Sequence, residues 1–275
     1  MVVVVKKVTL FSLIGAVLIA LRFRHHPAHA TASAMVPQLP VQTVDEAKEA
    51  LRDYIEEKKT VMKGWIHFAM VPVSLIGTMF LMIFAESTLS RVGAAVFCIT
   101  AVLLFSTSAI YHRGNGFWNR STHMFLKRLD HANIFFLIAG SSTPFGLFLL
   151  SGTHRIVFIS VVWAAAISGA AVKILWPNIH RGWGTTFYIL LGWFPVAFAG
   201  KFVEGAYGLG QTRGLLIVAL LVGGGIFYSV GAMFYVFKKP ILVPGIFEAH
   251  DLFHAFTAIA FVCHYSAISI AAYAM

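Results

Sequence analysis

Charged residues are scarce in this sequence: only 12% of its 275 residues are Asp, Glu, Lys or Arg, whereas 59% are hydrophobic. A soluble domain carries roughly a quarter charged residues, so this deficit excludes an ordinary soluble globular protein. Acidic residues are fewer than basic ones, with 11 Asp and Glu against 21 Lys and Arg, and the net charge is +10. In so apolar a chain, the basic excess indicates loops that contact anionic lipid head groups, and we expect no nucleic-acid partner.

Cysteine is equally rare, and its two residues, Cys98 and Cys263, both lie inside apolar runs. This pattern excludes a disulfide framework and a Cys-x-x-Cys metal site. The sequence has no internal repeat. The glycines at 205, 208 and 210 lack the strand–helix context that a dinucleotide-binding fingerprint requires.

Long apolar runs, in contrast, are abundant. Seven runs are candidates to cross a bilayer as helices, which takes roughly 20 residues each. They cover residues 65–85, 92–111, 131–150, 156–175, 185–200, 215–237 and 253–274. The fifth run is the shortest and contains Pro195, a residue that interrupts helices. The sequence therefore predicts an all-α membrane domain over residues 65–275, built as a bundle of seven transmembrane helices.

Two segments precede this domain. Residues 1–42 form an extension and linker with an apolar run at 8–21, for which three interpretations stay open: a signal-like segment, an extra span, or a translation start at Met35. Residues 43–64 open with a capping box, Thr-Val-Asp-Glu. We expect them to form an amphipathic helix on the membrane surface.

The basic residues indicate how the bundle is oriented. If the first span starts in the cytoplasm, the opposite side of the membrane carries only Arg91, Arg155, Lys201 and Arg213. The cytoplasmic side then carries Lys58, Lys59, Lys63, Arg113, Arg120, Lys127, Arg128, Lys173, Arg181, Lys238 and Lys239. Because cytoplasmic loops are enriched in Lys and Arg, we predict an N-in/C-out protein of the cell membrane.

Three short motifs bring polar groups to the end of the bundle that this orientation turns toward the cytoplasm. Ser108 and His112 close the second span, Asp130 opens the third, and His250 and His254 open the seventh. Both pairs are spaced i,i+4, so on helices the members of each pair share a face. Asp130 alone could pair with a neighbouring basic residue, and Ser108 alone could pack between helices. Their joint occurrence on one side of the membrane predicts a site.

The donor set of this site suits zinc. Three imidazoles, from His112, His250 and His254, leave a coordination position open for water or substrate, as catalytic zinc sites do, whereas calcium and magnesium prefer oxygen ligands. Zinc lowers the pKa of bound water toward about 7 and so supplies a nucleophile for a carbonyl group. Asp130 would be the general base or would hold the water, and Ser108 would donate to the water or to a developing oxyanion.

Other histidines fit this site less well. His131 directly follows Asp130 and should point roughly 100° away from it on a helix. His264 lies off the face of His254, where a packing or hydrogen-bonding role is expected. His67, near the cytoplasmic end of the first span, is a weaker candidate for a supporting residue.

The same motifs carry a resemblance to a known family. SAIYH, LDHANIFFLIAGSSTPF and HDLFH, in this order and spacing, resemble the bacterial hemolysin III family, and KGWIHFAMVP before the first span is also similar. That family belongs to the larger group of progestin and adiponectin receptor proteins, related to alkaline ceramidases. The resemblance covers roughly residue 58 to the end of the chain and leaves residues 1–34 outside.

The resemblance implies a seven-helix fold with its N-terminus inside. It also implies zinc held by His112, His250 and His254, a water bridged by Asp130, and Ser108 at the family's serine position.

Three functions are compatible with these features. The first is a ceramidase-like zinc hydrolase that takes a lipid amide or ester from the cytoplasmic leaflet. The second is a sensor or receptor in which the metal only fixes the helices, and the third is the cytolysis that the family name records. No run shows the continuous polar stripe of a pore. The expected partners are membrane lipids, with a lipid amide as candidate substrate, and no obligate protein partner is evident.

Overall fold

The computed structural model describes residues 62, 64–114, 117–176 and 181–275, which belong to one unit of the fold. The extension predicted for residues 1–42, and nearly all of the surface helix predicted for 43–64, lie outside the described residues. Both stay predictions.

Helices make up almost all of the described part of the chain. In chain order they are α3 (Trp65–Phe84), α4 (Thr88–Arg113), α5 (Arg120–Leu149), α6 (Gly152–Leu175), α7 (Arg181–Gly192), the 3₁₀ helix η2 (Phe194–Phe198), α8 (Ala199–Gly208), α9 (Gln211–Phe237) and α10 (Ala249–Ala272). Seven segments are long and apolar enough to cross a membrane, with Gly182–Gly208 counted as one of them. The predicted seven-helix membrane domain is therefore confirmed.

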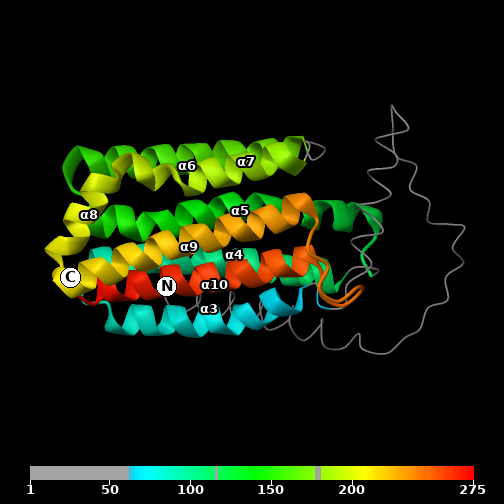
Figure 1. The fold of residues 1–275 in the computed structure, drawn as a ribbon, viewed down its shortest axis with the longest axis horizontal. Coiled ribbons are helices and arrows are strands. Elements are labelled where there is room, and N and C mark those ends of the chain that lie inside the picture. The colour runs from blue at the N-terminus through cyan, green and yellow to red at the C-terminus, as the bar shows by residue number, and fades with distance from the viewer. Residues whose placement is uncertain (1–61, 63, 115–116, 177–180) are drawn as a thin grey trace, which may run out of the picture. The chain divides into compact units, whose positions relative to one another are not determined.

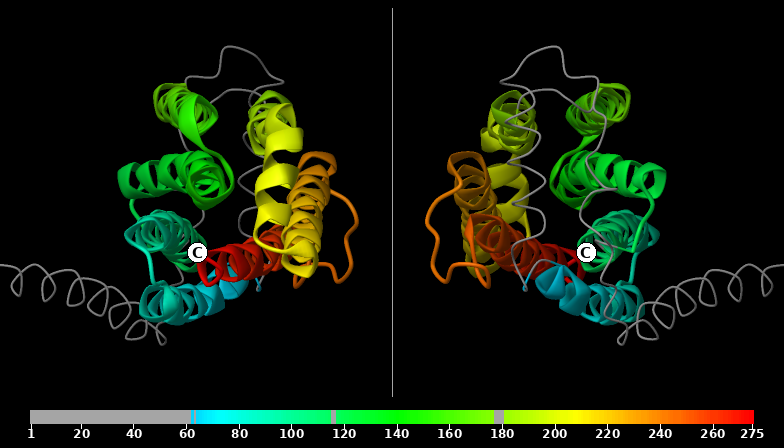
Figure 2. Two further views of the ribbon diagram at one scale, coloured as in Figure 1. Left: turned by 90° about the vertical axis from the view of Figure 1, so that its left-hand side faces the viewer. Right: turned by 90° about the vertical axis from the view of Figure 1, so that its right-hand side faces the viewer.

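The long helices lie side by side and alternate in direction (Figure 1). Helix α10 packs mainly against α9 and also contacts α3, α4 and α5. Seen along the helices, α5 and α6 lie on one side of the bundle interior and α7, α8 and α9 on the other (Figure 2). Because α4 and α10 contact each other and run in opposite directions, the last turn of α4 comes to the same end as the first turn of α10.

The outward faces of the helices are apolar, as contact with lipid requires. On α3, for example, Ile76, Phe80 and Ile83 are exposed, whereas Ser74 and Leu81 are buried. Helix α5 is the most enclosed of the seven spans.

Helix α5 begins earlier than the third predicted span, which starts at residue 131. The side chain of Asn119 caps the helix by accepting a hydrogen bond from the backbone N–H of Thr122 at 2.8 Å. The first turn of α5 is polar, and Lys127 and Arg128 follow soon after it, so this segment lacks the continuous apolar run that predicts a membrane span. Asp130 therefore lies about three turns inside a long helix rather than at its start.

The fifth span is also longer than the predicted 185–200, and it is interrupted. Pro195 stands in the first turn of η2, between α7 and α8. Proline cannot donate the hydrogen bond that a continuous α-helix would need at this point, and the chain turns through a 3₁₀ segment instead.

Candidate metal centre

The last turns of α4 carry Ser108 and His112, both buried. Gly64, the residue that caps α3, packs against this turn with a backbone φ of +82°, a conformation that favours glycine. A Cβ atom at this position would lie 2.9 Å from the Cβ of His112. The absence of a side chain at Gly64 thus lets the start of α3 approach the histidine closely.

A capping box fixes the first turn of α10, where His250 is located. The backbone N–H of Glu248 donates to Oδ2 of Asp251 at 2.9 Å, and the side chain of Glu248 accepts a hydrogen bond from the backbone N–H of Asp251 in return. These hydrogen bonds satisfy backbone groups that the helix leaves without intrahelical partners. One turn further, His254 lies on the same face as His250 and is almost fully buried.

The structure brings His112, His250 and His254 together. One ring nitrogen of each lies within 4.8 Å of those of the other two. The ring centroids are 4.9 Å apart for His112 and His250, 5.0 Å for His112 and His254, and 4.7 Å for His250 and His254. Zn–N bonds of about 2.0–2.1 Å place two ligand nitrogens at most about 4 Å apart. The three nitrogens could hold a metal ion once these side chains move closer together.

Asp130 lies beside this cluster. Its Oδ2 is 3.8 Å from Nε2 of His112, and the residue is buried. This distance is compatible with an ion pair but is too long for a direct hydrogen bond. The carboxylate can therefore accept a hydrogen bond from a water molecule between itself and the histidines.

Ser108 lies one turn before His112 and lines the same interior cavity as Asp130. Its hydroxyl is buried and has no hydrogen-bond partner among the described residues. A hydroxyl in this state is available to a ligand. The structure thus places all five predicted site residues at one end of the bundle.

His67 contributes more to this cluster than the sequence indicates. Its ring stacks on that of His254, with centroids 3.9 Å apart and an angle of 4° between the planes. It also contacts the ring of Phe105 edge-on at 5.1 Å. Its position near the end of the first span and the similarity of KGWIHFAMVP to the family were the only signals for this residue, because a contact between α3 and α10 leaves no trace in the spacing of either helix.

His131 is directed elsewhere, as its position next to Asp130 predicts. Its Nδ1 lies 2.7 Å from the backbone oxygen of Lys127, and its Nε2 lies 3.3 Å from the hydroxyl of Tyr235. The ring is therefore held by neighbours outside the three-histidine cluster.

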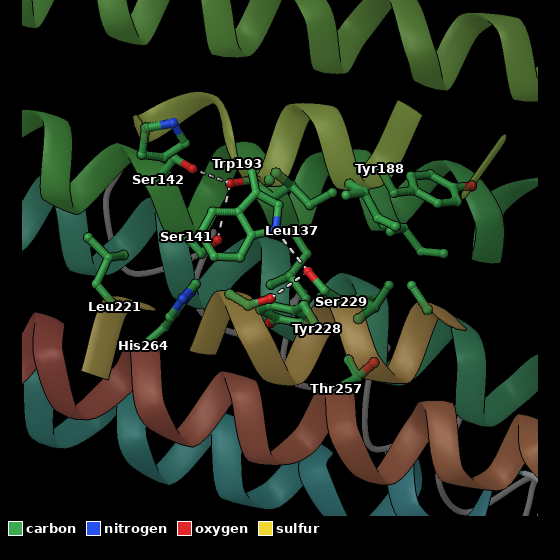
Figure 3. A pocket seen from close by; sticks show the side chains of 18 of the residues that line it. Leu137, Ser141, Ser142, Tyr188, Trp193, Leu221, Tyr228, Ser229, Thr257 and His264 are labelled. Atoms are coloured by element: carbon green, nitrogen blue, oxygen red, sulfur yellow. Dashed lines mark hydrogen bonds between the residues drawn. The ribbon is translucent and has the colours of Figure 1, made fainter. Parts of the chain in front are cut away.

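A cavity of about 200 Å³ extends from the cluster into the bundle. Its walls come mainly from α5, α7, α9 and α10, and its lining is largely apolar. Asp130 is the only Asp, Glu, Lys or Arg among the described residues that line it. Figure 3 shows a part of this cavity near Trp193 and His264. Such a chamber suits an apolar chain with few polar groups.

Comparisons with known proteins agree with this architecture. A family model described as haemolysin-III related matches residues 55–265. The chain is 30% identical over 202 residues to a hemolysin-3 homolog of Bacillus subtilis, which covers 72% of this chain and 87% of that protein. It is 31% identical over 148 residues to hemolysin-3 of Bacillus cereus, which covers 54% of this chain and 63% of that protein.

A plant protein is a more distant relative. The chain is 25% identical over 185 residues to heptahelical transmembrane protein 1 of Arabidopsis thaliana, which covers 64% of this chain and 53% of that protein. This relative fits the larger receptor group that the three motifs indicate.

Proposed function

This chain belongs to the haemolysin-III-related family of multi-pass membrane proteins, and we propose that it is a zinc-dependent hydrolase of a lipid amide or ester. The observation that carries the proposal is the convergence of three histidine nitrogens within 4.8 Å of one another. A buried carboxylate stands beside them at 3.8 Å from His112, at one end of an apolar cavity. A metal that only joined helices would need neither the carboxylate nor the cavity.

In this mechanism, His112, His250 and His254 hold the metal, and His67 keeps the ring of His254 in place by stacking. Zinc, when bound, polarises the carbonyl group and makes water a stronger nucleophile near neutral pH. Asp130 accepts the proton of the attacking water and returns it to the leaving amine or alcohol. The unpartnered hydroxyl of Ser108 donates a hydrogen bond to the carbonyl oxygen as negative charge develops there.

The cavity indicates the substrate class. An acyl chain can fill its apolar part, while the amide or ester bond lies next to Asp130 and the histidines. Because the described lining carries one negative and no positive side chain, a neutral linkage is favoured over a second anionic group. Membrane lipids with an amide or ester linkage, ceramide-like amides among them, meet these requirements.

The test is a turnover assay in detergent on protein with measured zinc occupancy, using a panel of short-chain ceramide-like amides and lipid esters. Asp130→Asn keeps the shape of the side chain but removes the base, so we expect turnover to fall roughly 10²–10⁴-fold while the metal stays bound. Ser108→Ala should lose less, because one neutral hydrogen bond contributes less than a general base.

Two outcomes of this assay would contradict the proposal. Undiminished turnover of zinc-loaded Asp130→Asn would remove Asp130 from the mechanism. No turnover by the zinc-loaded wild type across the panel would favour a sensor or receptor. One observation supports that second function: all three ligands come from α4 and α10, which already contact each other, so a metal there would clamp the two helices.

We further propose that the protein lies in the cell membrane with its N-terminus inside and the metal centre facing the cytoplasm. The excess of Lys and Arg in the loops on that side supports this orientation. A reporter that works only outside the cytoplasm, fused after Met275, should be active. An inactive fusion, combined with activity of a cytoplasmic reporter at the same place, would mean that the span count is wrong, at the fifth span or at residues 8–21.

The names of two relatives refer to haemolysis. A pore requires a polar lining along its length, whereas the cavity formed by the described residues carries a single charged side chain at one end. A lytic pore is therefore not the function that this chain's geometry supports best.

A further inference from the structure

A second group of polar side chains lines the cavity away from the metal centre. It consists of Ser141 and Ser142 on α5, Tyr228 on α9 and His264 on α10, and we call it the distal polar site (Figure 3). Along α10, His264 lies about 15 Å beyond His254, since each helical residue adds about 1.5 Å. The two polar groups thus lie at separate levels of one cavity.

The hydroxyl oxygens of the two serines in the distal polar site can each accept a further hydrogen bond. Ser141 and Ser142 both donate to the backbone oxygen of Ile138, at 3.1 and 2.8 Å. The neighbouring Ser229 is more fully occupied, because it accepts from Nε1 of Trp193 at 2.8 Å and donates to the oxygen of Gly225 at 2.8 Å.

Tyr228 and His264 are in a different state. The hydroxyl of Tyr228 is buried without a hydrogen-bond partner. The backbone oxygen of Leu221 can serve one ring nitrogen of His264 at most, so at least one of the two ring nitrogens has no hydrogen-bond partner among the described residues. The residue is only 8% exposed, and its ring meets that of Tyr228 at 5.5 Å between centroids. Buried polar groups in a membrane-spanning bundle are costly unless they are paired, so these two indicate a missing partner.

The fold makes room for this imidazole. A Cβ atom on Gly224 would lie 2.4 Å from Cδ2 and 2.5 Å from Nε2 of His264. In the adjacent position, a Cβ atom on Gly223 would meet nothing within 4 Å. The absence of a side chain at Gly224 thus lets the ring of His264 lie between α9 and α10.

We propose that the distal polar site binds a neutral hydrogen-bonding group, such as a hydroxyl or carbonyl, that a ligand carries partway along its apolar chain. The tyrosine hydroxyl and the imidazole can each donate or accept, and the two serines can accept. No Asp, Glu, Lys or Arg among the described lining residues lies at this level to balance a charged group, which is why a neutral one is expected. The inference rests on the proposed role of the cavity as a lipid chamber, but it does not depend on hydrolysis.

The experiment uses probes that cannot be hydrolysed: unbranched primary alcohols and terminal diols of equal chain length. Their affinities for the zinc-loaded protein in detergent are measured by calorimetric titration over a series of lengths. We expect the diol to bind roughly 2- to 10-fold more tightly than the matched alcohol, the range for one net hydrogen bond. The preference should be greatest where the second hydroxyl lies about 15 Å from the first, the rise between His254 and His264.

Three variants test which side chains cause the preference for the diol over the alcohol. Tyr228→Phe removes only the hydroxyl, and Gly224→Ala displaces the ring of His264, so both should bring diol and alcohol to similar affinity. Gly223→Ala adds a methyl group to the same helix without this contact and should keep the preference.

Equal affinity of the two probes for the wild type, or no binding of either, would overturn the proposal. So would a preference that persists in both Tyr228→Phe and Gly224→Ala, or one that Gly223→Ala also abolishes. A retained diol preference in a protein without turnover would contradict only the hydrolase.

Discussion

The two polar levels of the cavity both contain a buried histidine of α10, yet their surroundings differ. His254 lies among the imidazoles of His112, His250 and His67, with a carboxylate nearby. His264 meets the aromatic rings of Phe145 and Tyr228. The first environment supplies several nitrogens within reach of one ion, and the second supplies only neutral hydrogen-bonding groups.

This contrast shows that burial of a histidine in a membrane helix does not by itself indicate a metal ligand. His254 differs from His264 because a second helix, α4, places His112 next to it. The neighbouring helix α9 instead places Gly224 and the phenol ring of Tyr228 next to His264. Under the two proposals, the same residue type on one helix serves metal binding at one level and ligand recognition at the other.

The largest expected effect that tests this contrast is the loss of metal. The double variant His250→Ala, His254→Ala should bind no zinc, whereas the wild type should hold about one ion per chain, because a single remaining imidazole cannot replace three. The measurement is the metal content of purified protein by mass spectrometry. Because the ion binds only the folded state, a chelator should lower the melting temperature of the wild type and leave that of the double variant unchanged.

His264→Ala is the matched control, since it removes a buried histidine from the same helix. It should keep its zinc. Full zinc content in the double variant, or loss of zinc in His264→Ala, would remove the distinction between the two levels.

A smaller effect concerns the contact between Gly64 and His112. Gly64→Ala forces a side chain into a left-handed conformation and places its Cβ 2.9 Å from that of His112. Gly152→Ala provides the control, because Gly152 also has a positive φ, +53°, but a Cβ atom there meets nothing within 4 Å. Both variants should lose about 1–2 kcal/mol of stability from the backbone strain.

Only Gly64→Ala should also weaken zinc affinity, by roughly 10-fold, because it displaces a ligand of the metal. Competition with a fluorescent zinc chelator measures this difference. Equal zinc affinity in the two alanine variants would mean that the start of α3 does not position His112.

The sequence predicts features that repeat along one helix and the end of the bundle where polar motifs gather, but it misses most of the individual contacts between helices. Long apolar runs gave the seven spans, and the i,i+4 spacing of Ser108 with His112 and of His250 with His254 indicated which side chains share a face. The start of α5 was missed because polar and basic residues interrupt the apolar run in its first turns. The break at Pro195 could be located in the sequence, but the length of the span around it could not.

Individual contacts between helices could not be predicted from residue spacing. The stacking of His67 on His254 joins residues far apart in the chain, and neither helix repeats in a way that reveals it. His264 packs against the aromatic rings of Phe145 and Tyr228, as expected. Only the positions of α9 and α10 relative to each other show that Gly224 makes space for this ring.

The length of α5 has a consequence for the depth of the site. With 30 residues it is the longest of the described helices, and at about 1.5 Å per residue it extends about 45 Å, whereas the hydrocarbon layer of a bilayer is about 30 Å thick. If its far end is level with one surface of that layer, its first ten residues or so stand clear of the hydrocarbon, and Asp130 lies close to the boundary. That boundary is where the acyl chains of a bilayer lipid join its head group. A lipid could present its linkage to the carboxylate while its chains stay immersed, so no energy would be spent on extracting it from the membrane.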